Sequence, residues 1–216
     1  MNTIIVITAT VTVLSCLLFV SVMGYIWLVA RKSLSLWRKK SSRPNTVSVH
    51  TYKPNNSVIP PRGWLVLKEG CSLASKYNCP LILSVGKTVS GETRMESEIY
   101  RDGACSRFGT SGVSIITGGN PGVRETLGEV SETLVICHRF DSKEHIAIGL
   151  TPHMARIRLL WHRVHPENQN PHITFLPVSG PWKYWLWETA MLCLYAVAPP
   201  GSKLQGLLLN IVGRKG

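Results

Sequence analysis

The chain has 216 residues, of which 44% are hydrophobic and 17% charged, and this balance excludes an intrinsically disordered acidic or basic protein. The formal net charge of +12 comes from the two ends: residues 1–68 carry nine Lys/Arg and no acid, residues 69–188 are neutral, and three further cations follow. The distribution argues against a nucleic-acid partner, because phosphate recognition needs an excess of cations on the folded surface.

The first thirty residues predict a transmembrane signal-anchor helix. Residues 4–30 contain no charged side chain. As a helix they would be roughly 40 Å long, which is enough to cross a hydrocarbon core of about 30 Å. A cleaved signal peptide is the alternative, but it would need a basic start and a shorter apolar run than this one.

The residues that follow predict the orientation of the anchor. Positions 31–63 form a basic, Pro/Ser-rich segment that we expect to be a juxtamembrane linker. By the positive-inside rule, its cations place the amino terminus outside and the body in the cytosol, where cysteines stay reduced. A glycan on Asn55, which lies in an acceptor sequon, would contradict this topology. We expect anionic lipid headgroups to bind six cations: Arg31, Lys32, Arg38, Lys39, Lys40 and Arg43.

Hydroxyl side chains recur on one face of the predicted anchor, at Thr8, Thr12 and Ser15. Such a stripe can hydrogen-bond a neighbouring helix and so support a homo-oligomer. Alternatively, each hydroxyl can bond to the carbonyl four residues earlier in its own helix. The sequence leaves both open.

Residues 64–216 predict one β-rich α+β domain behind the anchor. Short apolar runs are separated by Gly, Pro and Asn, and the cluster at 118–122 is typical of a turn. Pro152 predicts the start of a helix that reaches Trp161. The expected strands are 64–67, 81–85, 113–117, 133–137, 145–150 and 172–178.

The end of the domain is apolar and rich in tryptophan. Residues 182–198 hold three Trp and two charged residues, Lys183 and Glu188. The segment fits a core helix, a helix lying in the membrane interface or a second span, and the pattern does not separate the three.

Three motifs fail on their spacing, so we predict no metal and no cofactor. Gly86-Lys87-Thr88 lacks the glycine that a phosphate-binding loop needs at position 81. The segment 109–112 resembles the nucleophile loop of chymotrypsin-like viral proteases, but no histidine and acid precede it at a usable distance. The histidines between 138 and 172 do not have the spacing of a zinc site.

One strand carries a motif with a possible catalytic role. His172-Ile173-Thr174-Phe175 resembles the His-apolar-Thr-apolar strand of 2H phosphoesterases, and His145-Ile146-Ala147-Ile148 is the nearest second copy. In that family two such histidines flank a phosphodiester as acid and base. The resemblance implies His145 and His172 as the acid–base pair with Thr174 beside them, although Ala147 replaces the second hydroxyl.

The sequence favours a non-enzymatic, single-pass membrane protein that presents a cytosolic interaction domain to protein partners. It does not show which proteins these partners are. The build of anchor, basic linker and one domain resembles viral accessory or matrix-like membrane proteins in architecture. The alternative is a membrane-tethered enzyme, namely a divergent phosphoesterase that uses His172.

Overall fold

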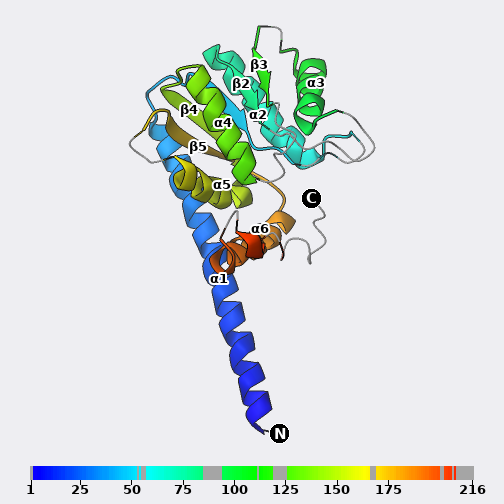
Figure 1. Ribbon diagram of the computed structural model, residues 1–216, viewed down its shortest axis with the longest axis vertical. Coiled ribbons are helices and arrows are strands. Elements are labelled where there is room, and N and C mark those ends of the chain that lie inside the picture. The colour runs from blue at the N-terminus through cyan, green and yellow to red at the C-terminus, as the bar shows by residue number, and fades with distance from the viewer. Residues whose placement is uncertain are drawn as a thin grey trace.

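The computed structural model describes residues 2–52, 54, 57–84, 94–110, 112–118, 126–165, 169–199, 202–205 and 207. The body contains one five-stranded sheet in the order β3-β2-β1-β4-β5, and every neighbouring pair is parallel (Figure 1). The strands are β1 (Thr46–Val49), β2 (Leu81–Leu83), β3 (Ile115–Thr117), β4 (Glu144–Leu150) and β5 (His172–Val178).

Helices cover both faces of this sheet. On one face, α2 packs on β1 and β4, and α3 packs on β2 and β3. On the other face, α5 packs on β4 and β5, and α4 packs on β2 and against α5. The end of α1 contacts β5 and α5. The last helix, α6, lies against α5 and α1 (Figure 1). The helices are α1 (Asn2–Lys39), α2 (Pro61–Tyr77), α3 (Glu96–Phe108), α4 (Thr126–Arg139), α5 (Thr151–Val164) and α6 (Lys183–Val197).

The central strands of the sheet are buried on both faces, as is usual for a parallel sheet. Every residue of β1 and β2 is buried, as are six of the seven in β4. Such strands need a helix on each side, and crossover helices between parallel strands supply them. The strands expected near 81–85, 113–117, 145–150 and 172–178 are confirmed.

Two of the predicted strands are helices, so the prediction of a β-rich α+β domain was wrong in its proportions. Residues 64–67 lie in α2, which Pro61 starts, and its buried residues recur on one helical face at Val66, Gly70 and Ala74. Residues 133–137 lie in α4. The fold is a mixed α/β fold with a parallel five-stranded sheet.

The first helix is longer than the expected anchor and is part of the body. It continues to Lys39, and Leu34 and Trp37 in its last turns pack against the core. The segment expected to be a linker therefore holds the end of α1 and all of β1. Among the residues that the structure describes, α1 is the one helix long and apolar enough to cross a membrane.

Candidate functional site

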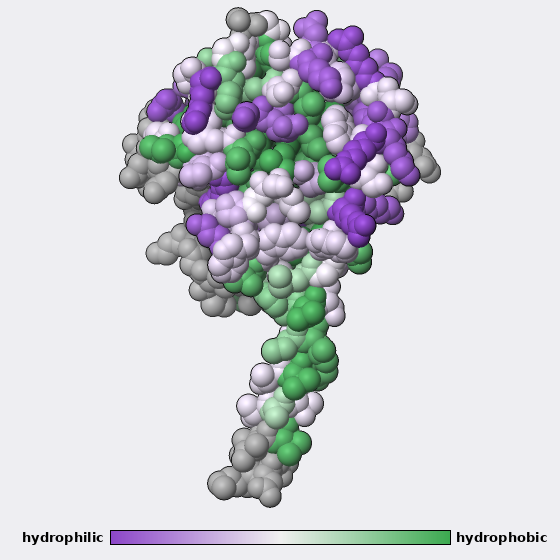
Figure 2. Space-filling view, turned by 180° about the vertical axis from the view of Figure 1, so that it is seen from behind, coloured by the Kyte–Doolittle hydropathy of each residue, from purple (hydrophilic) through white to green (hydrophobic). Residues whose placement is uncertain are grey.

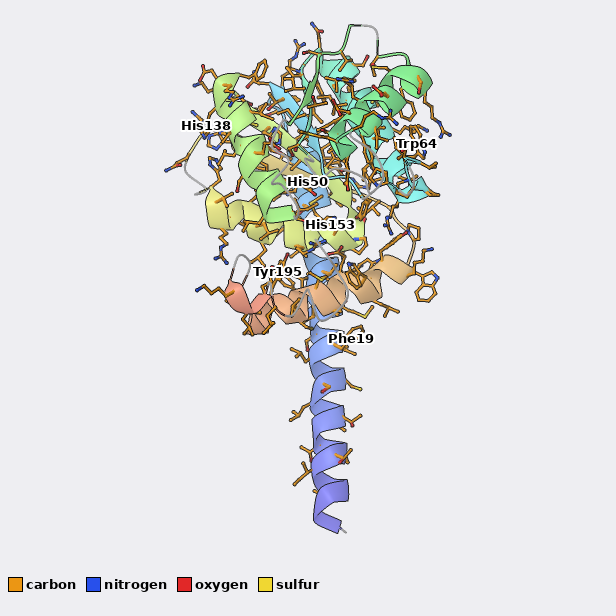
Figure 3. The ribbon with its side chains drawn as sticks, turned by 45° about the vertical axis from the view of Figure 1, so that its right-hand side comes forward. Phe19, His50, Trp64, His138, His153 and Tyr195 are labelled. Atoms are coloured by element: carbon orange, nitrogen blue, oxygen red, sulfur yellow. The ribbon has the colours of Figure 1, made fainter. Side chains whose placement is uncertain are left out.

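The sheet has one topological switch point, between β1 and β4. From β1 the chain builds outward to β2 and β3, and it then crosses over to β4 and builds outward to β5. In open parallel sheets, ligands bind outside the carboxyl ends of the strands at such a point. Here His50, Thr51 and Tyr52 follow β1, and Thr151 and His153 follow β4 (Figure 3).

His153 is the centre of a buried hydrogen-bond network at this edge. Its side chain is at the start of α5, its Nδ1 atom is 3.1 Å from the Tyr52 hydroxyl, and its Nε2 atom is 3.5 Å from Thr126 Oγ1. Arg156 Nη1 donates to the same threonine oxygen at 3.0 Å. The guanidinium of Arg156 also forms a two-bond ion pair with Glu188 on α6. This network thus links α4, α5 and α6.

A second histidine, His50, is coupled to a carboxylate. Trp161 Nε1 donates to His50 Nε2 at 3.4 Å, and an indole nitrogen can only donate. In the neutral imidazole the proton is therefore on Nδ1, which lies 3.4 Å from Glu129 Oε2 and donates to it. His50 is buried, but the Glu129 side chain retains 13% of its exposure. Glu129 is therefore the partly exposed member of this pair.

Tyr52 connects the site to α2, α3 and α6. The Tyr100 hydroxyl donates to the carbonyl of Tyr52 at 2.6 Å. The Arg62 guanidinium stacks over the rings of Tyr52 and Tyr184, 4.8 and 4.6 Å from their centres. Burial raises the pKa of Tyr52, and the charge of Glu188 raises it further. Its phenol therefore stays protonated and can donate a hydrogen bond to His153.

The neighbouring strands end in polar groups as well. Ser84 follows β2 and bonds to Thr133 Oγ1 at 2.5 Å, while Ser97 donates to the carbonyl of Gly118 after β3. A side chain at Gly118 would come closer than 3.0 Å to the Glu132 carboxylate, so that carboxylate lies directly against the strand end. The edge therefore offers hydroxyl, imidazole, phenol and carboxylate groups side by side.

Among the described residues, no group of three or more His, Cys, Asp or Glu side chains could hold a metal ion. The groups at this edge of the sheet are hydrogen-bond donors and acceptors, and they include two imidazoles. They fit a ligand rich in hydroxyl or amine groups, and the histidines and carboxylates can give or take protons.

The structure does not bring together the two histidines of the predicted acid–base pair. His145 is buried, with Nδ1 2.8 Å from Thr46 Oγ1 and Nε2 2.8 Å from Ser48 Oγ, and burial lowers its pKa to about 3. His172 pairs in register with Glu144. Because side chains alternate along a strand, His145 and His172 project from opposite faces of the sheet.

His172 and Thr174 line a different cavity, of about 540 Å³, along β5 between α1 and α5. Lys40 also lines it, but its ammonium is 2.5 Å from the Glu144 carboxylate and 3.0 Å from Thr174 Oγ1. Of the other predicted lipid-binding cations, Arg43 donates to the carbonyl of Tyr77. Lipid binding by the six cations stays a prediction.

The remaining predictions from motifs are only partly covered by the structure. Asn55, residues 86–88 and Ser111 lie outside the described residues. On α1, Thr12 donates to the carbonyl of Thr8, as expected for a hydroxyl that bonds within its own helix. All six cysteines are free thiols.

Sequence reasoning missed His153, Glu129, Tyr52 and the Arg156–Glu188 pair. The available signal was polar residues directly after buried strands, since His50-Thr51-Tyr52 follows the apolar run of β1. That signal needs the strands to be recognised as parallel, because only then do their carboxyl ends meet at one edge. The chain matches no protein family model and no curated protein, so the site alone carries the argument for function.

Proposed function

We propose that this protein is a membrane-anchored α/β domain that binds a small polar molecule between β1 and β4 and acts on it by acid–base chemistry. The observation that carries the proposal is the buried network around His153 at the carboxyl edge of the sheet. Burying imidazole, guanidinium and carboxylate groups costs stability, and a core alone has no need of them. Such groups cluster where ligands bind.

Two further buried atoms at the same edge are consistent with a ligand that binds there. Thr51 is buried, and its hydroxyl has no hydrogen-bond partner in the described part of the chain. The same holds for the Nε atom of Arg62, which stacks over Tyr52. Buried polar atoms are nearly always satisfied in folded proteins, and a bound polar molecule would satisfy these two.

We assign roles by position. His153 is a positioning residue, because both of its ring nitrogens are already bonded, and it orients the Tyr52 hydroxyl at this edge. Glu129 is the acid–base group, because its carboxylate is partly exposed and His50 fixes its position. The ligand would carry several hydroxyl or amine groups, since the edge presents mainly carboxylate, hydroxyl and imidazole partners.

The anchor in this proposal is α1. Its free part, residues 6–10 and 12–18, is exposed and apolar, which suits a bilayer and is unfavourable in water. The cations that follow favour a cytosolic body by the positive-inside rule. The alternative, which the sequence favours, is a purely non-enzymatic scaffold. A scaffold of that kind would not explain why a hydrogen-bond network is buried around His153.

The experiment compares H153N with H172N in the full-length, detergent-solubilised chain. Melting temperatures are measured against a panel of sugars, amino sugars, polyols, nucleosides and cyclic phosphodiesters, and each stabilising compound is then tested for turnover. We expect a compound that stabilises the wild type and H172N but not H153N. A compound whose effect is lost in H172N and kept in H153N would instead support a phosphoesterase site at His172.

A further inference from the structure

Helix α6 is apolar on both of its faces. Its inner face packs Met191, Leu192 and Tyr195 into the body. Its outer face exposes Trp182 at 74%, Leu186 at 46% and Trp187 at 36%. Lys183 and Glu188 are the only charged residues in the sequence of this helix, so its exposed apolar side chains favour an apolar environment over water.

The position of α6 along α1 indicates what that environment is. Ile26 of α1 packs against Leu192 of α6 and Ala155 of α5, with Val22 and Trp185 beside them. The two helices lie crosswise, and Phe19 lies just beyond the crossing, on the free side of α1 (Figure 3). A membrane that α1 crosses would thus have α6 lying along its surface.

The length of the free part of α1 agrees with this placement. From Asn2 to Val22, where contact with α6 begins, the helix is about 31 Å long, which is the thickness of a bilayer's hydrocarbon core. On the face shown in Figure 2, strongly hydrophilic residues lie at the far end and along the sides of the body, and the described residues next to the point where α1 leaves it are less polar. Both features put the bilayer surface at the level of α6.

We propose that α6 docks on the surface of the bilayer that α1 spans, with Trp182, Leu186 and Trp187 at headgroup depth. This rests on the membrane anchoring in the proposed function. Tryptophan is the side chain most typical of that depth, because its ring is apolar and its N–H can bond to headgroups. A lipid surface fits better than a second copy of the chain, since the apolar face of α6 continues onto the exposed apolar surface of α1.

The inner face of α6 connects this docking surface to the candidate site. Tyr184 lies 6.1 Å from Tyr52, ring centre to ring centre, and Glu188 binds Arg156. Along α1, Lys40 contacts the start of β4 through Glu144, whereas Ile26 contacts α5 directly after the end of β4. The carboxyl end of β4 is therefore its membrane-proximal end, and one helix separates the site from the lipid.

The experiment uses tryptophan fluorescence of the full-length chain in phosphatidylcholine vesicles, with and without bromine on the acyl chains near the headgroups. The variant W182F/W187F is compared with W64F, because Trp64 packs between α2 and α3 against Phe108. The fraction of tryptophan emission quenched by bromolipid should fall by at least a third in W182F/W187F relative to the wild type and should not fall in W64F. Trp27 of α1 and Trp185 of α6 are present in all three proteins and contribute to each.

The outcomes separate docking from anchoring. If alkaline carbonate releases the chain from the vesicles, both the anchor and the docking are wrong. If the chain resists carbonate but W182F/W187F is quenched as strongly as the wild type, the docking alone is wrong. Self-association in detergent that L186E abolishes, together with unchanged quenching in W182F/W187F, would show that a second copy covers α6.

Discussion

Arg156 on α5 and Glu188 on α6 form an ion pair that is almost completely buried. Arg156 Nε donates to Oε2 at 2.7 Å and Nη2 donates to Oε1 at 3.0 Å, and the two side chains are 5% and 2% exposed. Arg156 also holds Thr126, which contacts His153. A single side chain therefore joins the proposed membrane-docking helix to the proposed site.

Removing one partner of this pair should destabilise the protein strongly. We expect R156M to lower the free energy of unfolding by about 3–5 kcal/mol, because it leaves the Glu188 carboxylate buried and unpaired. The double variant R156M/E188M should recover at least half of that loss, since neither charge remains. Urea unfolding in detergent, evaluated as a double-mutant cycle, measures the coupling.

The exposed pair Arg101–Asp102 provides the control for this cycle. R101A should change the unfolding free energy by no more than about 0.5 kcal/mol, because exposed pairs are screened by water. If R156M were as mild as R101A, the pair would not be the buried link between α5 and α6 that the structure shows.

The Lys40–Glu144 pair should matter for how α1 is held on the sheet. The Lys40 side chain is 8% exposed and binds both Glu144 and Thr174, so it fixes the end of α1 to the starts of β4 and β5. K40M should lower the unfolding free energy by about 1–3 kcal/mol and speed proteolysis between α1 and β1. The matched control is K143M, whose partner Asp141 is 85% exposed and which should leave both unchanged. Equal effects of K40M and K143M would contradict this role.

His145 should make the protein less stable at mildly acidic pH. Its pKa is lowered by burial to about 3 in the folded state, against an ordinary value of 6.5. Between these values the unfolded chain binds a proton that the folded chain does not, so stability falls as the pH drops below 6.5. The loss at pH 5 is about 2 kcal/mol for this one group.

The measurement compares unfolding free energies at pH 7.5 and pH 5.0 for the wild type and H145Q. The glutamine cannot titrate but can bond to Thr46 and Ser48, so H145Q should lose about 2 kcal/mol less than the wild type on acidification. H172N, at an exposed histidine, should behave as the wild type does. A pH dependence that H145Q leaves unaltered would mean that His145 is not buried in its neutral form.

The sequence allowed the strands to be found more reliably than the helices between them. β4 and β5 were predictable because apolar and β-branched residues dominate both runs and a proline lies just outside each, at Pro152 and Pro171. α2 and α4 were not, because their short apolar runs at 64–67 and 133–137 fit either a strand or one turn of a buried helix. Only tertiary packing decides between the two.

The candidate site was harder still, because it is assembled from distant parts of the chain. Tyr52 and His153 are about a hundred residues apart in sequence and meet only because β1 and β4 are neighbours in a parallel sheet. The motif at His172 was local and therefore visible, but its partner at His145 lies on the other face. Local spacing could not show which residues share an edge.

Gly70 should be among the glycines least tolerant of substitution. It lies where α2 crosses β1. A Cβ atom at this position would come closer than 3.0 Å to the Val49 side chain and would lie 3.1 Å from Leu81 Cδ1. We expect G70A to cost about 1–3 kcal/mol of unfolding free energy, because overpacking this contact outweighs the roughly 1 kcal/mol by which alanine favours a helix. G24A on α1 is the control: its Cβ would meet nothing within 4 Å, so it should be neutral or slightly stabilising. Thermal unfolding of both variants measures the difference, and a G70A protein at least as stable as G24A would show that α2 does not approach β1 this closely.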